Sequence, residues 1–173
     1  PQEDEKENSK SYRIDALHKM TDSQKMAAIP LKMESSGTLK MFALYPSLKD
    51  VLDNGGTLFI DELNARLHPL LVRNIILTFL SPEINTQNAQ LIFTTHDIWQ
   101  FSNELLRRDE IWLVNKNRDG VSELYSLADF KDEDGNKVRR DEALSKKYLT
   151  GNYGAIPALK PMKMLTGRAA DGE

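Results

Sequence analysis

Two adjacent carboxylates follow a short apolar run near the middle of the sequence. The run Thr57 to Ile60 comes after a pair of glycines and ends at Asp61 and Glu62. Such a run favours a strand buried on both faces of a parallel sheet, and ligands of open α/β sheets bind at the carboxyl ends of such strands. There an aspartate can hold Mg²⁺ through water and a glutamate can take a proton from an attacking water. A strand that simply ends in solvent would have the same residues, so both interpretations remain open.

A histidine ends the next apolar run. Leu91 to Thr95 is followed by His96 and Asp97, which places His96 at the equivalent edge of the expected sheet. An imidazole there could hydrogen-bond a γ-phosphate or orient a water molecule. The alternative is that the polar residues from Thr94 to Asp97 cap a following helix, because short polar side chains accept hydrogen bonds from its first N–H groups.

A third polar motif precedes a long helical pattern. Ser35, Ser36, Gly37 and Thr38 offer hydroxyls and glycine-flanked N–H groups at a positive helix terminus, which favours an anion site. An ordinary serine N-cap would have the same sequence. The motif by itself leaves both interpretations open.

These three motifs need elements that position them. Apolar residues recur at three- and four-residue steps from Met41 to Leu52, which predicts a helix that ends at Asn54-Gly55-Gly56. Pro46 lies inside this pattern, so we expect a kink there or a boundary one turn earlier. A second helix is predicted from Pro69 to Leu80 and a third from Ile98 to Leu106.

The remaining pattern predicts a hairpin at the C-terminal end. Residues 111–114 and 121–127 flank a turn with Asp119-Gly120, a pair that suits antiparallel strands, and Ala143 to Leu149 could form a helical turn or two. The stretch before Lys32 shows little pattern. The predicted fold class is α/β, a mostly parallel sheet flanked by helices, with a terminal β-hairpin.

Composition narrows the classes of protein. The 173 residues include 23 Lys plus Arg, 26 Asp plus Glu, 40% hydrophobic residues and no cysteine, with a net charge of -3. This balance is typical of a globular domain, and it argues against a dedicated basic nucleic-acid-binding module. No apolar run approaches the roughly 18 residues of a membrane helix. The lack of cysteine agrees with a reducing, cytoplasmic setting.

The order of the three motifs resembles that of ATP-binding-cassette-type ATPases. The chain is similar to the C-terminal half of such a head, especially in bacterial stand-alone ATPases of the overcoming-lysogenisation-defect and abortive-infection kind, often described as AAA-family ATP/GTP phosphatases. On this resemblance Ser35 to Thr38 correspond to the signature loop, Leu58 to Glu62 to the Walker B strand, Asn64 to His68 to the D-loop, and His96 to the switch histidine. Residues 148–157 are similar to a C-terminal stretch of phage-defence ATPases.

The resemblance implies a mechanism for the site. Glu62 would be the general base, Asp61 would hold Mg²⁺ through water, and His96 would sense the γ-phosphate of ATP. The signature loop would contact ATP held by the other subunit, which implies a homodimer that sandwiches two nucleotides. His68 would touch the dimer interface or cap the helix that begins at Pro69.

Two features depart from the family pattern. No G-x-x-x-x-G-K-[ST] motif occurs in the sequence, so the loop that holds the α- and β-phosphates (Walker A) is missing and the fragment alone is expected to be inactive. Ser36 stands where transporters usually have glycine. Because the chain begins with Pro1, we expect a piece of a longer or processed protein. The family has the phosphate loop in an N-terminal lobe, so we expect that this lobe was removed or lies on another chain. The alternative is a degenerate pseudo-ATPase.

The sequence thus predicts three segments: a polar tail or linker over 1–11, the C-terminal ATPase lobe over 12–157, and a tail over 158–173. The leading function is ATP hydrolysis that drives an effector nuclease or toxin in bacterial defence, with nucleic acid as an additional partner and no membrane. The alternatives are a non-catalytic regulatory or nucleic-acid-binding module, and a DNA-repair or chromosome-maintenance ATPase head.

Overall fold

A computed structural model describes residues 12–21, 23–117, 119–132, 134–139 and 142–157. The chain forms two compact units, Pro1–His96 (unit 1) and Asp97–Glu173 (unit 2), each described here by itself. The predicted tails over 1–11 and 158–173 lie outside the described residues. Among the helices that the structure describes, none is both long and apolar enough to cross a membrane.

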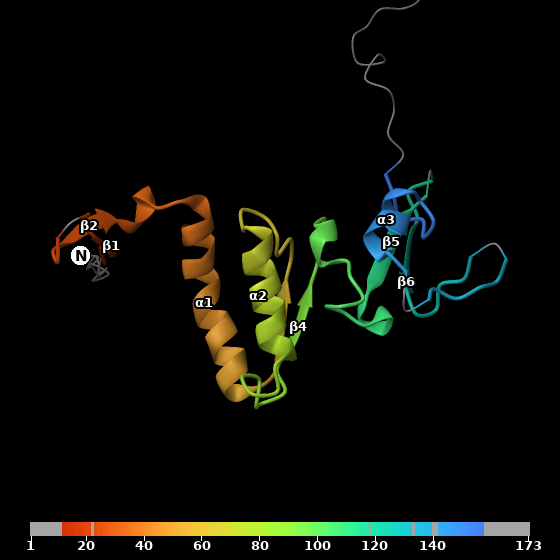
Figure 1. The fold of residues 1–173 in the computed structure, drawn as a ribbon, viewed down its shortest axis with the longest axis horizontal. Coiled ribbons are helices and arrows are strands. Elements are labelled where there is room, and N and C mark those ends of the chain that lie inside the picture. The colour runs from red at the N-terminus through yellow and green to blue at the C-terminus, as the bar shows by residue number, and fades with distance from the viewer. Residues whose placement is uncertain (1–11, 22, 118, 133, 140–141, 158–173) are drawn as a thin grey trace, which may run out of the picture. The chain divides into compact units, whose positions relative to one another are not determined.

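Unit 1 begins with a hairpin that the sequence pattern did not predict. Strands β1 (Asp15–Lys19) and β2 (Met26–Pro30) pair antiparallel, and a single 3-10 turn over Leu31–Met33 leads to the first long helix (Figure 1). All five residues of β2 are apolar or proline and do not alternate with polar ones, so the period-2 signal of a strand is weak.

Helix α1 (Ser36–Asn54) confirms the first predicted helix, and it begins before Met41, where the predicted pattern starts. It ends where Gly55 adopts φ 81°, a left-handed conformation that favours glycine. The helix continues through Pro46, so the predicted earlier boundary is wrong. Pro46 and Phe42 are exposed, and water can therefore satisfy the Phe42 carbonyl that loses its helical donor.

Strand β3 (Thr57–Ile60) and strand β4 (Gln90–Phe93) pair in parallel, with Ile60 opposite Phe93, and helix α2 (Pro69–Leu80) connects them. These strands and this helix confirm the predicted strand-helix-strand order. The described residues contain three two-stranded sheets, one parallel and two antiparallel. This mixture of helices and small sheets is compatible with a P-loop NTPase-like α/β fold.

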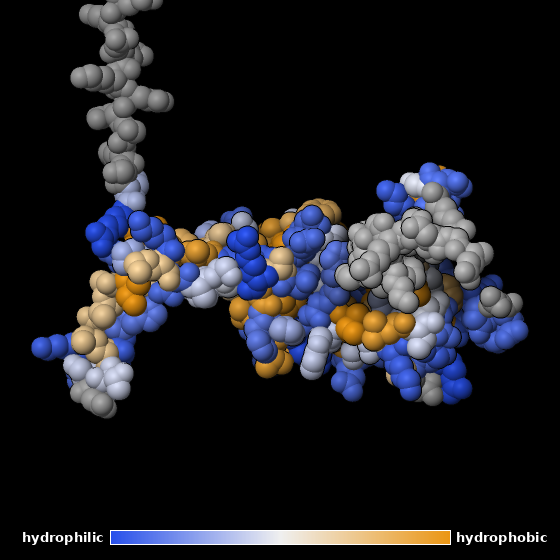
Figure 2. Space-filling view, turned by 90° about the horizontal axis from the view of Figure 1, so that it is seen from above, coloured by the Kyte–Doolittle hydropathy of each residue, from blue (hydrophilic) through white to orange (hydrophobic). Residues whose placement is uncertain are grey.

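The prediction that β3 is buried on both faces is wrong. Ile60 is 8% exposed, whereas its neighbour Phe59 is 71% exposed, so the strand alternates between a covered and an open face. Helices α1 and α2 contact β3 and β4 respectively. Each helix also has a buried side, with Leu48 buried on α1 and Val72 and Ile75 buried on α2. Hydrophobic surface is visible in Figure 2, and in unit 1 the large exposed apolar residues include Phe59, Leu70, Leu77, Leu80, Ile84 and Ile92.

Unit 2 holds the predicted terminal hairpin. Strands β5 (Trp112–Lys116) and β6 (Ser122–Ser126) pair antiparallel around Gly120, which has φ 82°. The predicted helix over 98–106 is wrong, because only a 3-10 turn forms over Ile98–Gln100, capped by the Asp97 carboxylate. Another 3-10 turn covers Arg108–Glu110.

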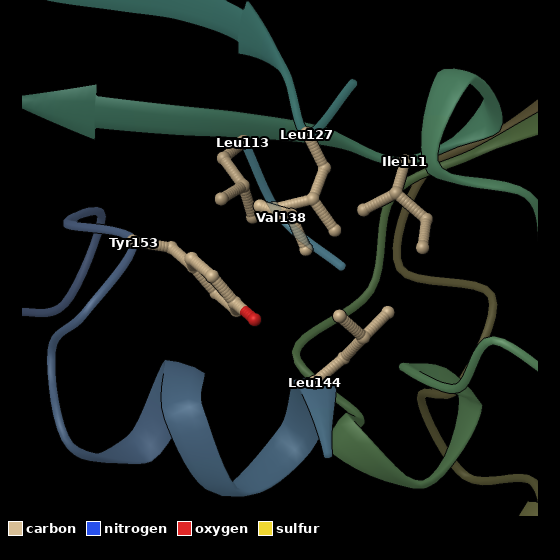
Figure 3. Packing of buried hydrophobic residues seen from close by; sticks show 6 residues of the cluster. All are labelled: Ile111, Leu113, Leu127, Val138, Leu144 and Tyr153. Carbon is tan, nitrogen blue, oxygen red and sulfur yellow. The ribbon is translucent and has the colours of Figure 1, made fainter. Parts of the chain in front are cut away.

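The core of unit 2 gathers around the segment that follows helix α3 (Leu144–Leu149). Figure 3 shows the Tyr153 ring among side chains from the hairpin and from the start of α3. Tyr153 is 2% exposed, and its ring lies edge-on to Phe130 at 5.5 Å. The buried members of this cluster are Ile111, Leu113, Leu127, Val138, Leu144 and Tyr153. Residues 148–157 therefore complete a hydrophobic core.

Candidate functional site

The turn after β3 holds the two carboxylates that the sequence singled out. The Thr94 hydroxyl at the end of β4 donates to Asp61 Oδ1 at 2.5 Å and accepts from the Glu62 N–H at 2.8 Å. The Leu63 N–H also donates to the Thr94 carbonyl at 3.0 Å, so the end of β4 fixes the turn at several points. Both carboxylates are exposed to solvent, where a ligand can reach them.

His96 lies at the same edge, as predicted. Its Nε2 is 3.8 Å from Glu62 Oε1, with 87% of the His96 side chain and 57% of the Glu62 side chain exposed. An exposed pair at this distance contributes little to stability, which leaves both groups available for a ligand. Of the residues that were candidates for a cap, Asp97 caps the 3-10 turn that follows, because its carboxylate accepts from the Trp99 N–H at 2.9 Å. The structure thus brings Asp61, Glu62 and His96 together.

The Ser35 to Thr38 motif begins helix α1, and its first serine is a capping residue. Ser35 Oγ accepts from the Thr38 N–H at 3.1 Å and lies 2.9 Å from Thr38 Oγ1. Ser36 is exposed, and the N–H groups of Ser36 and Gly37 make no backbone hydrogen bond to the other described residues. The donors left for an anion are therefore the Ser36 hydroxyl and these two N–H groups.

The same motif packs against the loop that follows the carboxylates. A Cβ added at Gly37 would lie 2.8 Å from the Arg66 carbonyl oxygen, closer than a side chain can approach. Only glycine fits this contact without a shift of the backbone. The signature-like motif therefore contacts the loop over residues 64–68, and the structure shows no hydrogen bond from it to Asp61, Glu62 or His96 within the described part of the chain.

This loop is tied down at both ends. Asn64 Oδ1 accepts from the Thr95 hydroxyl at 2.9 Å, and His68 Nδ1 accepts from the Leu70 N–H at 3.2 Å. His68 is thus the N-cap of α2, which confirms the capping alternative for this residue. Arg66, between the two anchors, adopts φ 63°.

Sequence reasoning missed Lys40. Its ammonium, on α1, donates to the carbonyl oxygens of Glu62 at 2.7 Å and Leu63 at 3.1 Å. Burial lowers the pKa of Lys40 below its ordinary value, the charge of Glu62 opposes this, and Arg66 reinforces it. A lysine in the middle of a helical pattern carries no motif, so no local signal could have indicated this contact.

The carboxylate oxygens at the turn suit Mg²⁺ bound through water. Mg²⁺ keeps several waters and is commonly held by one or two carboxylates together with substrate phosphates. The exposed Asp61 carboxylate, oriented by the Thr94 hydroxyl, fits that requirement. Within the described residues, no three His, Cys, Asp or Glu side chains are grouped so that they could bind a metal without such further ligands.

The contact between Gly37 and Arg66 yields a prediction for stability. Gly37→Ala should destabilise the protein by about 1–2 kcal/mol, because overpacking costs about 1–3 kcal/mol and the better helix propensity of alanine returns at most about 1 kcal/mol. Chemical denaturation measures the change. Ser36→Ala is the matched control on the same turn, with an expected change within about 0.5 kcal/mol. Equal stabilities of Gly37→Ala and wild type would contradict the contact.

The described residues of unit 1 thus place an acidic pair at the end of a strand, a histidine beside it and a helix N-terminus with exposed donors. Residues 3–98 match the family described as "AAA domain, putative AbiEii toxin, Type IV TA system", and the chain belongs to that family. The match supports a relation to AAA and P-loop ATPases and a nucleotide-binding, ATPase-type function. No curated protein matches the chain.

Proposed function

We propose that this chain is part of a dimeric, ATP-binding-cassette-type ATPase head that binds and hydrolyses ATP with Mg²⁺. The observation that carries the proposal is the pairing of Glu62 with His96, 3.8 Å apart at the carboxyl ends of two parallel strands. A general base must lie within hydrogen-bond reach of the water that it activates. Exposure of both side chains at the strand ends leaves room for that water and a phosphate.

Each residue at this edge has a separate task in the proposal. Glu62 accepts the proton of the attacking water, and Asp61 holds Mg²⁺ through water while the Thr94 hydroxyl orients its carboxylate. His96 donates a hydrogen bond to the γ-phosphate. Mg²⁺, when bound, neutralises charge on the phosphates.

In the proposed dimer, the N-terminus of α1 contributes to the ATP site of the second subunit. Ser36 and Gly37 would donate to the γ-phosphate of ATP held by the second subunit, while Ser35 and Thr38 keep the first turn closed. Among the described residues, the N–H groups of Ser36 and Gly37 have no backbone acceptor and this turn makes no hydrogen bond to Glu62 or His96, which supports this division between two sites. The dimer is therefore part of the proposed mechanism.

Further parts of the proposal concern the rest of the protein. We assign residues 12–157 to the C-terminal lobe of the head, and the phosphate loop to an N-terminal lobe outside this sequence or on another chain. The lobe would supply the other strands at the edges of a mostly parallel sheet and would cover the open face around Phe59. Because the matched family is described with an AbiEii toxin, we propose that the cycle controls an effector nuclease or toxin in bacterial defence, in the cytoplasm.

The test measures ATP turnover and molar mass of the full-length protein with ATP and Mg²⁺, and again with the metal chelated. We expect turnover that requires Mg²⁺ and a dimer that forms with ATP. A full-length protein that has a phosphate loop and neither binds nor hydrolyses ATP would refute the proposal. That result would favour the non-catalytic regulatory or nucleic-acid-binding module.

A further inference from the structure

The backbone of the proposed general base adopts an unusual conformation. Glu62 has φ 48°, in the left-handed region that non-glycine residues rarely enter. Such a conformation costs about 1–3 kcal/mol and persists only where the surroundings impose it. The direction of the Glu62 carboxylate therefore depends on the groups that hold this one residue.

Three hydrogen bonds hold the peptide groups of Glu62. Its N–H donates to the Thr94 hydroxyl at 2.8 Å, and its carbonyl accepts from the Ala65 N–H at 3.0 Å and from the Lys40 ammonium at 2.7 Å. Thr94 belongs to the end of the neighbouring strand, and Ala65 belongs to the turn itself. Lys40 is the contributor from helix α1, and its bond is charge-assisted, which makes it stronger than a neutral one.

The Lys40 ammonium reaches two successive carbonyls. It also donates to the Leu63 carbonyl at 3.1 Å, and Leu63 is fully buried at 0% exposure. A single cation that binds both carbonyls restricts rotation about the backbone bonds of Leu63, which lie between them. Lys40 is itself half-buried. Its ammonium contacts the carbonyl oxygens of the turn and makes no hydrogen bond to the Glu62 carboxylate among the described residues.

Helix α1 thus contacts the turn after β3 and the loop over residues 64–68 at two points. One is the Lys40 ammonium on residues 62 and 63, and the other is the close approach of Gly37 to the Arg66 carbonyl. The first turn of the same helix carries the free N–H donors of Ser36 and Gly37.

We propose that Lys40 is a positioning residue that orients Glu62 from helix α1. The inference rests on the proposed function for the role of Glu62 as base. Lys40 touches neither water nor phosphate in this scheme. It acts through the backbone of residues 62 and 63, beside the attraction between its charge and that of Glu62.

The first test compares three variants of the full-length protein. Lys40→Met removes the donor but keeps the length of the side chain, and Lys40→Arg keeps the charge and can donate to both carbonyls. Lys49→Met is the matched control, because Lys49 lies on the same helix and pairs with Asp53 at the surface, 2.5 Å away. The readouts are kcat and KM for ATP.

We expect Lys40→Met to lower kcat by about 10- to 100-fold with KM within about twofold, since misplacement of a catalytic group by about 1 Å can cost that much. Lys40→Arg should recover most of the loss, and Lys49→Met should match wild type. A purely structural role for Lys40 would change the unfolding midpoint without this division between kcat and KM. Unchanged kcat in Lys40→Met would overturn the proposal.

A second measurement separates this proposal from the proposed function. Amide hydrogen exchange of the full-length protein without nucleotide should be at least about tenfold faster at Glu62 and Leu63 in Lys40→Met, with Ile76 of α2 unchanged. If exchange accelerates but wild type hydrolyses no ATP, Lys40 supports the turn while the assignment of Glu62 as base is rejected. If exchange at the turn is unchanged, the positioning role is refuted whether or not ATP is hydrolysed.

Discussion

The Glu62→Gln variant of the full-length protein should lose ATP turnover by about 10²–10⁴-fold, the usual contribution of a general base. Glutamine matches glutamate in shape but cannot take the proton of the attacking water. The Glu62 side chain is 57% exposed, and the hydrogen bonds that fix this residue come from its backbone. The fold should therefore survive, and ATP should remain bound in a dimer that no longer hydrolyses it.

Two measurements together check this result. Steady-state turnover gives the loss of rate, and light scattering with ATP and Mg²⁺ gives the fraction of dimer. Glu83→Gln is the matched control, because Glu83 is an exposed glutamate of the same unit that lies just beyond α2. Turnover that is unchanged in Glu62→Gln would contradict the role of Glu62 as base and would favour a regulatory module.

The elements with strong local signals were predicted well from the sequence. Strand β3 has the predicted bounds because glycines precede it and carboxylates end it, and α2 begins and ends at Pro69 and Leu80 as expected. The hairpin around Gly120 was likewise predicted from its turn residues. In each case the residues at both ends of the element restrict the backbone, so the information is local.

The failures have a common physical cause, which is that the deciding contact is remote. Burial of Phe59 depends on which face the helices cover, and no pattern within β3 carries that information. The region over 98–106 has the apolar spacing of a helix, but Phe101 and Leu106 pack against the core cluster of unit 2, and the chain turns between them. Tertiary packing overrides propensity there.

The candidate site likewise has features that the sequence could predict and features that it could not. Strand order placed Asp61, Glu62 and His96 at one edge, because parallel strands share their carboxyl ends. The contacts of Lys40 with residues 62 and 63, and of Gly37 with Arg66, join segments more than twenty residues apart. Spacing along the chain therefore could not reveal them.

The Tyr153→Ala variant should destabilise unit 2 by about 3–5 kcal/mol, the usual cost of removing a large buried aromatic side chain. Tyr153 is 2% exposed and its ring contacts Phe101 and Phe130, so its loss leaves a cavity in the core of Figure 3. Both tryptophans of the chain, Trp99 and Trp112, lie in unit 2. Tryptophan fluorescence during urea unfolding of the chain therefore measures this change, and a loss below about 1 kcal/mol would contradict the packing.

Tyr153→Phe separates the ring from its hydroxyl, which donates to Glu142 Oε2 at 2.8 Å. Burial opposes ionisation of Glu142, yet bonds from the Arg139 N–H, the Tyr153 hydroxyl and Lys147 outweigh it and lower its pKa. A lowered pKa means that the carboxylate stabilises the fold above its unfolded pKa of about 4.3, and that this stability is lost as pH falls through the folded pKa. The phenylalanine variant should therefore lose about 1–2 kcal/mol at pH 7, and less at a pH where Glu142 is protonated, because a hydrogen bond to a charged acceptor is the stronger one. A deficit that does not depend on pH would show that the hydroxyl acts by packing alone.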